Sequence, residues 1–126
     1  MFFKKKDKTI KAMYFEGIDT FPTHTPCDLT IQNETLIITK TATGTTVTLP
    51  FERIIMAEYF LYEQEFMLKY HNEAVKTGKS GNKYYMAIHY LNKEGDKKML
   101  AFWETLGNKL QKLSEELPSR EENIAL

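Results

Sequence analysis

The last third of the sequence restricts the fold more than any other part. Residues 83–91 and 99–102 have the composition of β-strands, and turn residues at 92–96 connect them. Directly after the second strand, apolar side chains recur at intervals of three and four residues, the spacing of one helical face, until Pro118. These side chains are Trp103, Leu106, Leu110, Leu113 and Leu117. The pattern predicts an antiparallel sheet closed off by one amphipathic C-terminal helix over 103–117.

The earlier residues alternate in the way that half-buried strands do. Cys27, Leu29 and Ile31 alternate with polar residues, and Asn33-Glu34 predicts a two-residue turn into the next strand. Turn signals recur about every 8–12 residues, which favours a β-barrel or a sandwich over an α/β fold. The predicted strands, about seven in all, cover 12–15, 27–32, 35–41, 45–49, 53–62, 83–91 and 99–102.

Residues 53–62 differ from the other predicted strands because both of their faces are apolar. One face carries Ile55, Ala57, Tyr59 and Leu61, and the other carries Ile54, Met56, Phe60 and Tyr62. Such a strand needs cover on both sides, and the C-terminal helix can supply one of them. Either residues 63–82 fold over the other side, or a homo-oligomer buries it. Within that segment, 66–70 extends the strand or begins another, and 72–76 forms a helical turn.

The length of 126 residues predicts a single domain over 12–117, with a basic arm over 1–11 and an acidic polar tail over 118–126. Cys27 is the only cysteine, so no intrachain disulfide can form, and its place in a strand predicts a small buried hydrophobe. The sequence shows no secretory signal and no run of about 20 apolar residues. We therefore expect a soluble cytoplasmic protein.

Three stretches resemble the pleckstrin-homology (PH)-like superfold, and within it the small bacterial PH-like domains. The first is 25–31 followed by 35–38. The second is 46–54, where a strand leads through Leu49-Pro50 and an aromatic residue into the next strand. The third is 85–90 with the turn at Gly95 and the terminal helix. The resemblance covers about 12–117 and implies a mainly β (α+β) fold, a bent antiparallel barrel of about seven strands capped by one C-terminal amphipathic helix.

Members of this superfold are mostly binding modules. Some hold phosphoinositides through basic residues around the first two strands, and others hold peptides between a strand and the C-terminal helix. Here no Lys or Arg occurs between Ala12 and Ile38, and Glu16 and Asp19 stand in the first loop, so the usual phosphoinositide pocket is not expected. The resemblance implies a non-catalytic module that recognises a protein or peptide, or a second copy of itself, at a groove beside the helix or an exposed sheet edge.

Charge and motif content argue against several other functions. Seventeen basic and seventeen acidic residues cancel, whereas a nucleic-acid-binding protein usually has a basic excess. Three histidines (His24, His71 and His89) lack the spacing of a helical zinc site, and His89 is predicted to be an ordinary hydrogen-bonded strand residue. We predict no metal ligands, no cofactor and no nucleic-acid partner.

No catalytic signature is found either. Glu63 and Glu65 would share a strand face as solvated carboxylates, and the loop 78–81 lacks the upstream glycine of a P-loop. The aromatic residues fall mostly at core positions, with Phe21 expected to be the most exposed. We predict no catalytic residue and identify no small-molecule substrate. A small-ligand carrier or an unrecognised enzyme is the weaker alternative.

The N-terminal arm suggests another role, attachment to anionic membranes. Basic and aromatic residues are clustered in its first eight positions: Phe2, Phe3, Lys4, Lys5, Lys6 and Lys8. Each lysine near an anionic bilayer contributes about 1 kcal/mol, and the phenylalanines can insert between lipids. The arm is thus the candidate membrane-binding site.

Deleting residues 1–8 tests this membrane alternative. The full chain should sediment with phosphatidylserine vesicles at low salt and less at physiological salt, because the Debye length is then only about 8 Å. The truncated chain should stay in the supernatant, as both proteins should with phosphatidylcholine vesicles. Equal sedimentation of the two proteins with phosphatidylserine would contradict the membrane alternative.

Overall fold

The computed structural model describes residues 9–74 and 82–120 and shows a mainly β protein with two α-helices. In chain order the elements are β1 (Thr9–Glu16), β2 (Thr25–Gln32), β3 (Thr35–Lys40), β4 (Thr46–Pro50), β5 (Ile54–Phe60), α1 (Glu63–Tyr70), β6 (Tyr84–Leu91), β7 (Lys97–Glu104) and α2 (Lys109–Glu116). A short 3₁₀ helix, Phe51–Arg53, connects β4 to β5. Neither helix of the described residues has the length and apolar character to cross a lipid bilayer.

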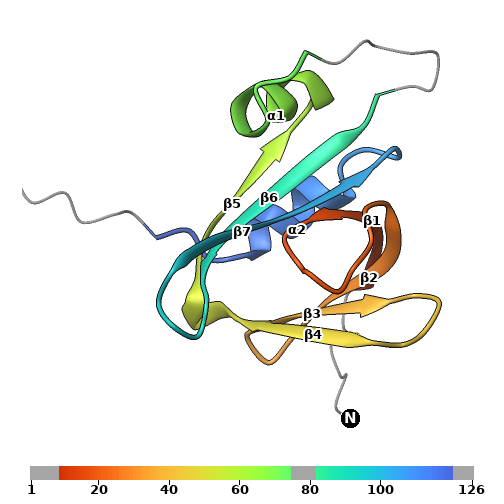
Figure 1. Cartoon of the computed structure of the whole chain (residues 1–126). Coiled ribbons are helices and arrows are strands. Elements are labelled where there is room, and N and C mark those ends of the chain that lie inside the picture. Colours follow the sequence, from red (N-terminus) through yellow and green to blue (C-terminus); the bar gives the residue numbers. More distant parts are fainter. Residues whose placement is uncertain (1–8, 75–81, 121–126) are drawn as a thin grey trace, which may run out of the picture.

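The seven strands form one antiparallel sheet in the order β4-β3-β2-β1-β7-β6-β5. Strand β1 connects the two halves, since it pairs with β2 through residues Thr9 to Tyr14 and with β7 through Met13 to Glu16. Figure 1 shows the sheet bending so that β3 and β4 cross below β5, β6 and β7. The prediction of a mainly β fold with a bent, antiparallel sheet of about seven strands is confirmed.

Two predicted turns are present. Asn33 and Glu34 both have positive φ angles, 51° and 56°, as a two-residue hairpin turn requires, and Gln32 pairs with Thr35 across it. In the turn between β6 and β7, the Asn92 side-chain oxygen accepts hydrogen bonds from the backbone N–H groups of Glu94 and Asp96. Local residue type is therefore enough to determine both hairpins.

The main core lies on the inner face of the bent sheet, where α2 packs against β5, β6 and β1. Three residues of the predicted helical stripe are buried here: Leu110, Leu113 and Leu117. They belong to one buried cluster with residues from both halves of the sheet, among them Leu29, Leu36, Ile38, Leu49, Ile54, Ile88 and Phe102. The docking of an amphipathic C-terminal helix onto the sheet is confirmed.

The predicted start of that helix was wrong. β7 continues to Glu104, because Trp103 pairs with Tyr85 on one side and with Met13 on the other. The chain then bends at Gly107 and Asn108, whose positive φ angles of 69° and 60° are incompatible with a helix. As a result Trp103 lies in a strand and Leu106 is 78% exposed.

A β-bulge changes which faces β5 presents. Ile54 pairs with Tyr90 and Met56 with His89, so Ile55 is an extra residue in the strand. Ile54 therefore faces the main core together with Ala57 and Tyr59, whereas the sequence alternation placed it on the opposite face. The strand also ends at Phe60, which leaves Leu61 and Tyr62 exposed rather than within it.

Helix α1 occupies the segment that the sequence left ambiguous, and the expectation of strand structure at 66–70 was wrong. Phe66 is fully buried and stacks on Tyr85, with ring centroids 4.5 Å apart. It belongs to a second, outer cluster together with Phe60, Ala87 and Ala101. The outer face of β5 is thus covered by α1 and its inner face by α2, so this strand no longer gives a reason for self-association.

Replacing Leu110 with Asp tests the docking of α2. The substitution places a charge without a partner in the main core, and we expect it to lower the free energy of unfolding by about 3 kcal/mol or more. Leu106→Asp is the matched control, and because Leu106 is exposed it should change stability by at most about 0.5 kcal/mol. Urea unfolding measures both variants, and an unfolding midpoint of Leu110→Asp equal to that of the control would show that α2 is not docked as described.

Candidate functional site

Of the two expected partner surfaces, a groove beside the last helix or an exposed sheet edge, the edge at β5 is partly covered by the chain itself. The backbone N–H of Arg120 donates to the carbonyl oxygen of Ile55 at 2.8 Å. Its guanidinium group donates to the carbonyl oxygens of Glu52 and Phe51, at 2.8 and 3.2 Å. The residues after α2 therefore cover the beginning of this edge strand.

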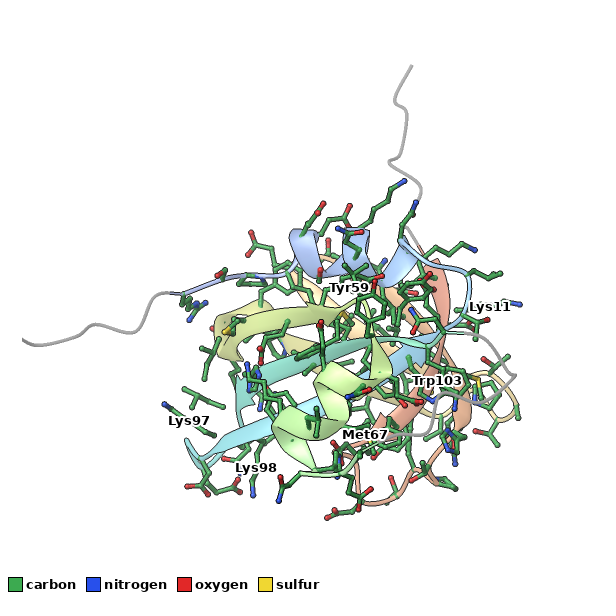
Figure 2. All side chains as sticks on the ribbon, turned by 90° about the horizontal axis from the view of Figure 1, so that it is seen from above. Lys11, Tyr59, Met67, Lys97, Lys98 and Trp103 are labelled. Carbon is green, nitrogen blue, oxygen red and sulfur yellow. The ribbon has the colours of Figure 1, made fainter. Side chains whose placement is uncertain are left out.

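A different edge remains open in the middle of the sheet. Over Thr9–Ala12, β1 pairs only with β2 among the described strands, because its pairing with β7 begins at Met13. After Trp103 the chain diverges from β1 on its way to α2. Where the two diverge lies a groove of about 320 Å³, which we call the β1 groove. Figure 2 shows Lys11 and Trp103 on the same side of the molecule, at this groove.

The lining of the β1 groove is mostly apolar. Its apolar members are Ala12, Met13, Pro26, Cys27, Trp103 and Leu106, and its polar members are Lys11, Thr41, Glu104 and Thr105. Leu106 is the most exposed of the large hydrophobic residues of the described chain. A single exposed leucine is ordinary on a protein surface, but here it borders a preformed hollow next to an open strand edge. The groove can therefore bury an apolar side chain and pair with a backbone.

Glu104 attaches the groove wall firmly to α2. Its carboxylate is buried, and its Oε1 accepts hydrogen bonds from the backbone N–H groups of Lys109 and Leu110, both at 3.1 Å. Asn108, the residue before the helix, supplies no side-chain cap. A strand residue thus caps the helix and places a negative charge at the positive end of the helix dipole. This role could not be predicted from the sequence pattern, which assigned Glu104 to the helix itself.

Trp103 forms the other part of the wall and is held from two sides. Its indole N–H donates to Nδ1 of His24, in the loop between β1 and β2, at 3.0 Å. The ammonium group of Lys83 lies 4.6 Å from the centre of the ring, within the range of a cation–π contact. Sequence reasoning treated His24 as a loop residue, and only the pairing of β7 brings Trp103 to it.

Cys27 and Phe21 are both buried. Burial, with the charge of Asp28 beside it, raises the pKa of the Cys27 thiol to about 11, so the group stays protonated. The prediction of a small buried hydrophobe is confirmed. Phe21 was expected to be exposed, and that was wrong: the loop folds back so that its ring packs edge-on against Tyr14, at 5.4 Å between centroids.

The other two histidines pair with carboxylates on the outer face of the sheet. Nε2 of His71 lies 2.8 Å from Glu16, and Nε2 of His89 lies 2.5 Å from Glu58. His89 is therefore a hydrogen-bonded strand residue, as predicted. Within 9–74 and 82–120, no group of three or more His, Cys, Asp or Glu residues is placed to hold a metal ion.

Glu58 is the centre of a polar network that holds the end of α1. It accepts hydrogen bonds from the ammonium group of Lys69 at 2.5 Å, from the hydroxyl of Tyr70 and from His89. Burial acts to raise the pKa of Glu58, but these hydrogen bonds and the charge of Lys69 outweigh it and hold the pKa below its usual range. The carboxylate is therefore ionised and fully engaged within the fold.

A cavity of about 340 Å³ adjoins this network, lined by Ile55, Met56, Glu58, Lys69, His89, Lys97 and Lys98. Figure 2 shows Lys97 and Lys98 on the opposite side of the molecule from Lys11 and Trp103. The two groups of this cavity that could act on a ligand, Glu58 and His89, are hydrogen-bonded to each other. The strand edge beside the cavity is covered at its start by Arg120. The β1 groove is the better candidate site because it combines an open backbone edge with apolar lining.

Glu63 and Glu65 stand in the first turn of α1, so their predicted place on a strand face was wrong. Acidic residues are favourable at a helix N-terminus, and Glu63 accepts a hydrogen bond from the Tyr85 hydroxyl at 2.6 Å. The arm residues Phe2, Phe3, Lys4, Lys5, Lys6 and Lys8, and the loop at 78–81, lie outside the described residues.

No protein-family model and no curated protein matches this sequence. The PH-like resemblance therefore rests on the sequence patterns given above. The structure shares with it an antiparallel sheet of seven strands and a helix after the last strand, which is agreement in architecture and not an assignment to the family.

The Glu58 network should make stability depend on pH in acid. Because the folded-state pKa of Glu58 is lowered, its contribution is present above the unfolded-state pKa and is lost as the pH falls through the folded-state value. At pH 7 we expect Glu58→Gln to cost about 1–2 kcal/mol. The stability difference between the two proteins should shrink below about pH 4.

Urea unfolding between pH 3 and 7 measures this effect. Glu94→Gln, an exposed carboxylate in the turn before β7, is the matched control and should follow the unmodified protein throughout. A difference between Glu58→Gln and the unmodified protein that stays constant over this pH range would show that Glu58 is not stabilised in its ionised form.

Proposed function

We propose that this chain is a non-catalytic, PH-like binding module that takes an extended peptide segment of a protein partner into the β1 groove. One observation carries the proposal: the first half of β1 has an open edge, and an apolar groove lies directly against it. The preference for a protein or peptide partner agrees with the sequence resemblance.

The open edge supplies the backbone part of the recognition. Unpaired N–H and C=O groups of a strand edge are a template for another strand, and peptide-binding domains use this geometry for β-augmentation. Thr9–Ala12 offer such an edge over four residues. Backbone pairing of this kind does not depend on the sequence of the peptide.

The groove supplies the side-chain part. Fully burying an aliphatic side chain contributes about 1.5–3 kcal/mol, and Leu106 together with part of the Trp103 ring can bury one apolar residue of the peptide. Lys11 is the cation of the groove, while the carboxylate of Glu104 is engaged at the start of α2. We therefore expect a peptide with one apolar anchor and a nearby acidic residue, bound with an affinity in the micromolar range, about −8 kcal/mol.

The ionisable groups of the groove support a binding role rather than a catalytic one. The thiol of Cys27 is buried and protonated, because burial raises its pKa to about 11. Glu104 is taken up by the helix N-terminus. Neither residue is available as a nucleophile or a general base.

Selection from a random peptide library, followed by calorimetric titration of the selected peptides, tests the proposal. Selected peptides should share an apolar anchor, and Leu106→Asp should weaken their binding by about tenfold or more, since it replaces an apolar contact with a charge. Leu68→Asp is the matched control: Leu68 is also exposed but lies on α1, and its substitution should leave the affinity unchanged.

Two results would contradict the proposal. One is a set of peptides that bind Leu106→Asp as tightly as the unmodified protein. The other is a map of NMR shift changes that omits residues 9–13 and 103–106. A second copy of the chain is one form of the proposed partner, and in that case a dimer measured by light scattering should dissociate in Leu106→Asp.

A further inference from the structure

The wall of the β1 groove contains the only tryptophan of the chain, and its indole is held by a titratable group. The N–H of Trp103 points at Nδ1 of His24, 3.0 Å away, and the two rings are roughly perpendicular, at 75°. The backbone fixes the position of His24, because its N–H donates to the carbonyl oxygen of Tyr14 at 2.7 Å. The imidazole is thus presented to the indole by the loop between β1 and β2.

The direction of this hydrogen bond determines the protonation state of the imidazole. An indole N–H can only donate, so Nδ1 of His24 must accept and must carry no proton. An imidazolium ion carries a proton on both nitrogens and cannot accept the bond. Protonation of His24 therefore breaks its hydrogen bond with the Trp103 indole, and rotating the imidazole ring cannot restore the bond because both ring nitrogens then carry a proton.

Most of the charged groups around the indole and the imidazole are engaged with partners of their own. Lys83 already lies over the ring of Trp103, and its own carboxylate partner is Glu63, at 3.8 Å on α1. The ring of Phe15 contacts both His24 and His71, and His71 is paired with Glu16. The charged residues that line the groove beside Trp103 are Lys11 and Glu104, whose carboxylate is engaged at the start of α2. Among the described residues no carboxylate forms an ion pair with His24.

We infer that His24 is a positioning residue that makes peptide binding at the β1 groove depend on pH. Neutral His24 fixes the indole N–H of Trp103 in the groove wall, and protonated His24 removes this contact while Lys83 remains over the ring. Histidine side chains in general change charge between about pH 5 and 8, which is within the physiological pH range. This inference rests on the proposed function, because it concerns the affinity of the same groove.

The first measurement uses the free protein. A chain with one tryptophan gives one indole N–H signal in a ¹⁵N NMR spectrum, and that signal should move between pH 7.5 and 5.5. In His24→Gln the signal should stay nearly constant, because the amide oxygen accepts the hydrogen bond without titrating. His71→Gln and His89→Gln are matched controls, because these histidines pair with Glu16 and Glu58 and not with the indole, and the indole signal of both variants should respond to pH as in the unmodified protein.

The second measurement is the affinity of a selected peptide at the same two pH values. Unmodified protein should bind about three- to tenfold more weakly at pH 5.5, the factor that corresponds to losing one exposed hydrogen bond. His24→Gln should bind equally well at both. A pH dependence that persists in His24→Gln, or an indole signal that does not respond to pH, overturns the inference and leaves the proposed function standing. Failure of every peptide to bind counts against the proposed function, while the indole signal still decides the role of His24.

Discussion

The structure depends on the divided pairing of β1. Thr9–Ala12 pair with β2, Met13 and Tyr14 pair with both β2 and β7, and Glu16 pairs with β7, so this one strand joins the two halves of the bent sheet. The turn at its end needs a glycine: a Cβ on Gly17, whose φ is +111°, would lie 2.3 Å from the carbonyl oxygen of Met99. The bend encloses the main core, and the change of partner along β1 leaves the groove open.

The two faces of the sheet are stabilised in different ways. The inner face is covered by leucines of α2 that contact strands from both halves, and its stability comes mainly from apolar burial. The outer face is covered by α1, which has one fully buried residue, Phe66. The two ends of this helix are tied to the sheet by the hydrogen bonds of Lys69 to Glu58 and of Tyr85 to Glu63. The stability of this outer helix therefore depends more on charge and pH than the stability of the main core does.

Most of the sheet could be predicted from local patterns. Features that depend on contacts between residues distant in sequence could not. The alternation at Cys27 and Leu29 and the turn at Asn33 depend on neighbouring residues, and both were predicted correctly. Trp103 has a spacing that suits a helix, yet pairing with β1 and β6 keeps it in a strand. The β1 groove could not be predicted, because it depends on which strands diverge and on the exposure of Leu106, a residue assigned to the core.

The cap that Glu104 provides for α2 has a consequence for the order of folding. Eight residues are too few for a stable isolated helix, and the carboxylate that satisfies its first N–H groups comes from a strand that must first pair with β1, far away in sequence. We therefore expect α2 to form after the sheet, so that its contacts retard unfolding more than they accelerate folding. On this argument, the resistance of the folded molecule to transient opening should depend strongly on its last helix.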